Sequence, residues 1–66
     1  MYTVYKNIHQ AIKDMQIIAD ENSAALQKVQ GGSDEYFRLH KRKEDIYELL
    51  RALCEAEKIA GRITEA

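Results

Sequence analysis

The stretch VQGGSDEYF, residues 29–37, contains the one obvious break in this chain. Two adjacent glycines follow a long periodic segment, and glycine just past a helix end accepts the left-handed conformation that closes the last turn. Ser33 is a favourable N-cap, and negative charge on Asp34 and Glu35 stabilises the first turn of a following helix through its dipole. The stretch therefore predicts a helix end, a turn at 31–33 and a second helix from about residue 34.

Apolar residues recur with helical spacing on both sides of this turn. In heptads that start at Met1, twelve of the thirteen a, d and e positions before the turn are apolar, and Asn22 is the exception. With Leu39 at position a, nine of the twelve corresponding positions after the turn are apolar. Helices are expected over about 3–30 and 34–62. A short loop makes such helices antiparallel neighbours, so we predict an all-α chain, a single helical-hairpin domain over 1–66.

The apolar stripes are too wide for a hairpin to cover alone. On the second helix the stripe extends to His40, Tyr47 and Cys54 and spans about 160° of the helix surface. A chain of 66 residues with one cysteine also buries little core by itself. We therefore predict a homo-oligomer, preferably a dimer that forms a four-helix bundle, with another protein as the alternative occupant. The predicted interface residues are Ile8, Ile12, Met15, Ile46, Tyr47, Leu50, Leu53 and Cys54.

In length and in its single central turn, the chain is similar to the plasmid copy-control bundles of the Rop type. This resemblance is one of architecture, and no functional motif matches residue by residue.

Two polar residues interrupt the stripes at a similar height. A hairpin centred near residue 32 pairs positions whose numbers sum to about 64, which brings Asn22 close to Arg42. A buried polar layer can fix register and oligomeric state at some cost in stability. We predict such a layer, formed by Asn22 and Arg42, near the turn.

The composition narrows the classes of function. Ten basic and eleven acidic side chains give a formal net charge of -1, which argues against a general nucleic-acid binder. The N-terminal sequence lacks the pattern of a signal peptide, and no apolar stretch approaches the length of a membrane helix. One thiol fits a reducing compartment. We expect a cytoplasmic protein without membrane contact.

No catalytic, cofactor or metal site is predicted. His9 and His40 have no partner at metal-ligand spacing on their own helices, apart from the common His40–Glu44 pair. Cys54 has no histidine on neighbouring turns, and it is expected to be a buried or half-buried inert thiol. An enzyme is the least favoured class because no acid–base pair presents itself.

The run RLHKRK, residues 38–43, is the one dense basic patch. Ordinary solvation of a helix face explains it most simply, since acidic residues follow at once. The favoured function is a small regulatory or adaptor protein that acts through helix-mediated protein contacts and self-association. The alternative is a small dimeric RNA- or DNA-binding regulator, with phosphate contacts from Arg38, Lys41, Arg42 and Lys43.

Overall fold

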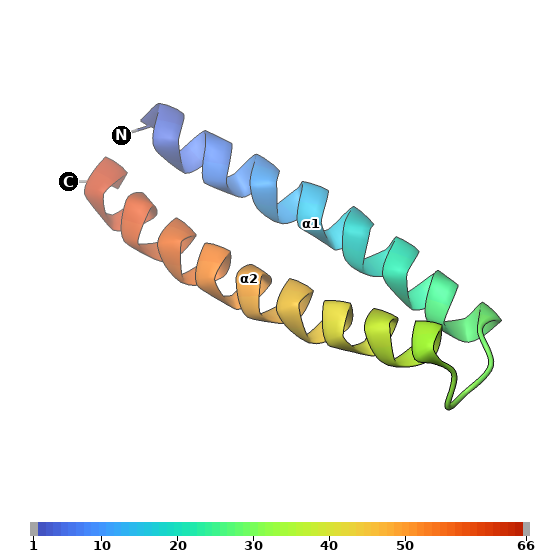
Figure 1. Ribbon diagram of the computed structural model, residues 1–66. Coiled ribbons are helices and arrows are strands. Elements are labelled where there is room, and N and C mark those ends of the chain that lie inside the picture. Colours follow the sequence, from blue (N-terminus) through green and yellow to red (C-terminus); the bar gives the residue numbers. More distant parts are fainter. Residues whose placement is uncertain (1, 66) are drawn as a thin grey trace.

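The computed structural model describes residues 2–65 and consists of two long antiparallel helices. Helix α1 (Tyr2–Lys28) and helix α2 (Asp34–Glu65) lie side by side, joined by one turn, so the two chain ends lie together (Figure 1). The Cα extents are 50 × 15 × 11 Å. The predicted all-α hairpin is confirmed, and no strand occurs among the described residues.

The turn follows the chemistry of its residues. Gly32 has a φ of 88°, so the left-handed position falls on the second glycine. Ser33 caps α2, because its Oγ accepts a hydrogen bond from the backbone N–H of Tyr36 at 3.1 Å. Both the Oγ and the backbone N–H of Ser33 donate to the carbonyl of Gln30. These bonds define a turn over residues 30–33, and α1 ends at Lys28 rather than at the predicted residue 30.

The helices meet along a single narrow seam. Among the side chains that the structure describes, the buried apolar ones are Ile12, Ile46 and Ala60, and Asn22 is the buried polar one. Other seam residues are only half-buried, since two helices cannot enclose one another. The core of one hairpin is therefore small. Neither described helix combines the length and the apolar character needed to cross a membrane.

Candidate interaction surface

The two broad faces of the hairpin differ in character. On one face, the ring of Tyr5 lies 3.5 Å from the place where a Cβ on Gly61 would stand. Nearby, His9 Nδ1 and Glu57 Oε2 are 2.6 Å apart. These contacts show which rows of the two helices adjoin on this side. We call this side the polar face, and it carries Tyr2, His9, Gln16, Ser23, His40, Tyr47, Cys54 and Gly61.

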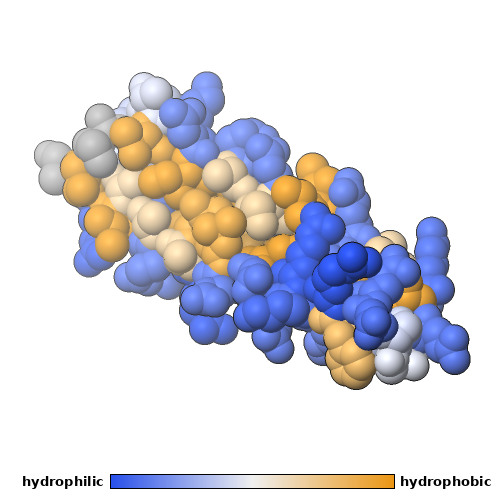
Figure 2. Space-filling view, in the orientation of Figure 1, coloured by the Kyte–Doolittle hydropathy of each residue, from blue (hydrophilic) through white to orange (hydrophobic). Residues whose placement is uncertain are grey.

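The opposite broad face is lined with aliphatic side chains. In an antiparallel pair, the rows on the other side of each helix must also adjoin, which brings the α1 row that begins at Val4 beside the α2 row that contains Leu49. Figure 2 shows an apolar band along this face, from the chain ends past the middle, that gives way to hydrophilic residues toward the turn. We call it the apolar face, formed by Val4, Ala11, Ile18, Ala25, Leu49, Ala52, Ala56, Ile59 and Ile63.

Several of these side chains are exposed in the single hairpin. Val4 is 45% exposed, Leu49 46%, Ile59 44% and Ile63 49%. On α2, the spacing from Leu49 through Ala52, Ala56 and Ile59 to Ile63 alternates between three and four residues. This spacing is typical of a seam that receives a further helix. The apolar face therefore has both the composition and the periodicity of an unfilled helix-packing surface.

Most of the predicted interface residues lie elsewhere. Ile12 and Ile46 are buried between the two helices, so they stabilise the hairpin itself and do not present a free surface. Ile8, Met15, Leu50 and Leu53 are half-buried along the same seam. Tyr47 and Cys54 are exposed, on the polar face.

The predicted interface includes the exposed flank of Tyr47 and Cys54, whereas the exposed aliphatic row of α2 lies on its other flank. Heptad periodicity identifies the residues that face inward, but it does not say which inward rows the partner helix covers. The exposed apolar row continues through Ala52 and Ile59, two positions that the a, d and e count leaves out. The apolar residues of this row are the feature of the sequence from which the apolar face could have been predicted.

Cys54 is exposed, contrary to the expected buried or half-buried thiol. It follows Leu53 on the helix, and a step of one residue turns its side chain by about 100°, out of the seam toward the polar face. Within the hairpin, α1 does not cover the Cys54 side chain.

Within one hairpin, Asn22 is the buried residue of the predicted polar layer. Asn22 is 2% exposed, and its Nδ2 donates to the backbone carbonyl of Leu39 at 3.1 Å. Its Oδ1 is buried and has no hydrogen-bond partner among the described residues. Arg42 is exposed and forms no hydrogen bond with Asn22; its position in the sequence puts it on the row of α2 that also contains Leu49 and Ala56. Within one hairpin, the layer consists of Asn22 against the main chain of α2.

The basic patch is accessible, but half of its charges are engaged nearby. Arg38, Lys41 and Arg42 are exposed. Lys41 Nζ lies 3.4 Å from Asp45 Oδ1, and Lys43 Nζ lies 5.9 Å from the centre of the Tyr47 ring. Such surface pairs are weak individually. The patch is an accessible cationic surface with local acidic neighbours.

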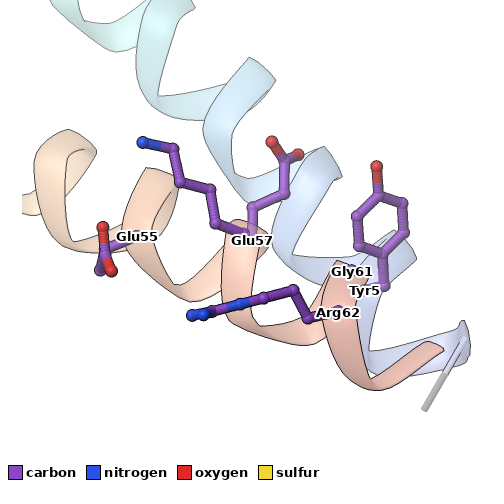
Figure 3. Close-up of a pocket in the computed structure, with 6 residues that line it drawn as sticks. Tyr5, Glu55, Glu57, Gly61 and Arg62 are labelled. Atoms are coloured by element: carbon purple, nitrogen blue, oxygen red, sulfur yellow. The ribbon is translucent and has the colours of Figure 1, made fainter. Parts of the chain in front are cut away.

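The remaining polar groups form no evident chemical centre. A shallow hollow beside Tyr5 and Gly61 is lined by charges of both signs, and in Figure 3 Arg62 and Glu55 project from α2 away from Tyr5. His40 lies against Tyr36, with ring centroids 5.3 Å apart. Among the side chains of residues 2–64, no group of three His, Cys, Asp or Glu is arranged to hold a metal ion.

Comparison with known proteins returned no match to a protein-family model, a curated protein or a solved structure.

Proposed function

We propose that this protein is a small non-enzymatic regulatory or adaptor protein that acts through helix-mediated protein contacts, including contacts between its own copies. The observation that supports the proposal is the apolar face, a continuous aliphatic surface on a hairpin with little core of its own. Monomeric proteins rarely leave such a surface in water, because burying it stabilises the protein. Association through helices is the means of action that this surface favours.

The size of the surface supports the same proposal. The Cα extents of 50 Å by 15 Å give the broad face a projected area of about 750 Å², the same order as the roughly 800 Å² of accessible surface that each partner buries in a standard protein interface. A second hairpin on this face would complete a four-helix bundle and enclose aliphatic side chains that two helices leave exposed.

The test is the solution mass, measured by light scattering over a wide concentration series. The proposal with self-association predicts a dimer, twice the chain mass of 7.6 kDa. A monomer at every concentration would remove self-association and leave only a different protein as the occupant of the apolar face.

A second candidate function is a dimeric RNA- or DNA-binding regulator. The supporting observation is that Arg38, Lys41 and Arg42 are exposed near Phe37, an aromatic side chain that is 60% exposed. Binding of labelled RNA or duplex DNA should then weaken steeply with salt and disappear when the four basic residues of the patch are changed to alanine. Absence of binding at low salt would exclude this candidate.

A further inference from the structure

We infer that the apolar face takes a second copy of this chain, with the turns of the two hairpins at the same end of the bundle. The inference rests on the proposed self-association and adds the geometry of the pair. It follows from the uneven distribution of side chains along the apolar face, which is apolar from the chain ends past the middle and hydrophilic near the turn (Figure 2).

At the turn end of the apolar face, acidic and basic side chains lie at a similar position along the hairpin axis. The hydrogen bond from Asn22 to the carbonyl of Leu39 places these two residues level with each other. Glu21 precedes Asn22, and Arg42 lies three residues beyond Leu39, about 4.5 Å further along the axis. Arg38 lies one turn earlier on the same edge. At this height the α1 edge of the apolar face carries Glu21 and the α2 edge carries Arg38 and Arg42, while Lys28 and Asp45 lie further along the same rows.

With both turns at one end, a twofold axis along the bundle sets α1 of each hairpin against α2 of the other. The partner's Glu21 then lies near Arg42 and Arg38, and the same contact forms twice. Aliphatic residues near the chain ends meet the corresponding aliphatic residues of the partner. The two ion pairs found among the side chains of residues 2–64, His9–Glu57 and Lys41–Asp45, involve none of these groups.

With the turns at opposite ends, α1 lies on α1 and α2 on α2. Arg42 then faces the partner's Ala56 and Ile59, where its guanidinium would be covered by aliphatic side chains. About the midpoint of α1 near residue 15, the two Asp14 residues would face each other, and the two Glu21 residues would lie about 18 Å apart along the axis with no arginine of α2 opposite them. Asp14 meets acidic neighbours in both arrangements, so it does not discriminate between them. The pairing of Glu21 with the partner's arginines forms only when the turns lie at the same end, so it favours that arrangement.

Distances between spin labels at the turn test this geometry. Gly31 suits a cysteine, because its φ is not positive and a Cβ there meets no atom within 4 Å. The protein would carry Gly31→Cys together with Cys54→Ser, and its mass would be checked after labelling. Turns at the same end predict one distance within about 25 Å, since neighbouring bundle helices lie 8–10 Å apart. A distance near the hairpin length of 50 Å would overturn the inference while leaving self-association intact.

Charge reversal provides a second, independent readout. Glu21→Lys should raise the dimer dissociation constant about tenfold, and adding Arg42→Glu to the same chain should restore it to within about threefold. Glu44→Lys, on the outer surface of α2, is the matched control and should leave the constant unchanged. Helicity measured by circular dichroism separates folding from association. A double variant as weak as the single one would overturn the inference, and a monomeric parent protein would overturn the proposed self-association with it.

Discussion

Replacing Ile59 by alanine tests the role of the apolar face, and the exposed fraction of Ile59 gives the expected loss of dimerisation free energy. Full burial of an isoleucine side chain contributes about 1.5–3 kcal/mol, and the 44% of Ile59 that remains exposed in the hairpin corresponds to about 1 kcal/mol when a partner covers it. A twofold interface contains the residue twice, so Ile59→Ala should weaken the dimer by about 2 kcal/mol. This corresponds to a roughly thirtyfold larger dissociation constant.

The assay is sedimentation equilibrium over a concentration range that spans the dissociation constant. Ile17→Ala is the matched control, because Ile17 is 57% exposed on the outer surface of α1, away from the apolar face. Both variants exchange the same side chains within a helix, so their effects on helix propensity cancel in the comparison. Equal dissociation constants for the two variants would refute the assignment of the interface to the apolar face.

Three further predictions concern stability, measured by urea unfolding at one fixed protein concentration. Asn22→Leu should raise stability by about 1 kcal/mol, because it removes the buried Oδ1 that lacks a partner; a loss of stability would show that this oxygen is satisfied in solution. Ser33→Ala should cost about 1 kcal/mol through loss of the cap on α2, whereas an unchanged midpoint would count against the capping contact. Gly32→Ala should cost about 1–2 kcal/mol and Gly31→Ala close to nothing, since only Gly32 has a positive φ; similar effects at both would contradict the turn geometry.

The hairpin could be predicted from the sequence because its signals are local. Two glycines followed by Ser33 and two acidic residues determine the turn, and each of these contributes through its own backbone or cap chemistry. The ends of the helices were predicted less accurately than their presence. Helix α1 ends at Lys28, and in the turn beyond it the carbonyl of Gln30 accepts two hydrogen bonds from Ser33, a contact that no residue propensity contains.

The interaction surface was less predictable because it depends on how two helices divide their apolar rows. A heptad count assigns both Ile12 and Leu49 to core-facing positions. In the structure, however, Ile12 is buried and Leu49 is 46% exposed. The contact between His9 and Glu57 was missed for a related reason. The assumed pairing sum of 64 placed His9 near residue 55, whereas the helices pair it with residue 57.

The most direct test of the central claim compares the isoleucine methyl groups in one spectrum. Ile17, Ile59 and Ile63 have similar exposure in the single hairpin, at 57%, 44% and 49%. With methyl-labelled isoleucine and a soluble paramagnetic agent, a second copy on the apolar face predicts strong line broadening for Ile17 and protection for Ile59 and Ile63. Equal broadening of all three methyl groups, at concentrations well above the dissociation constant, would contradict the account.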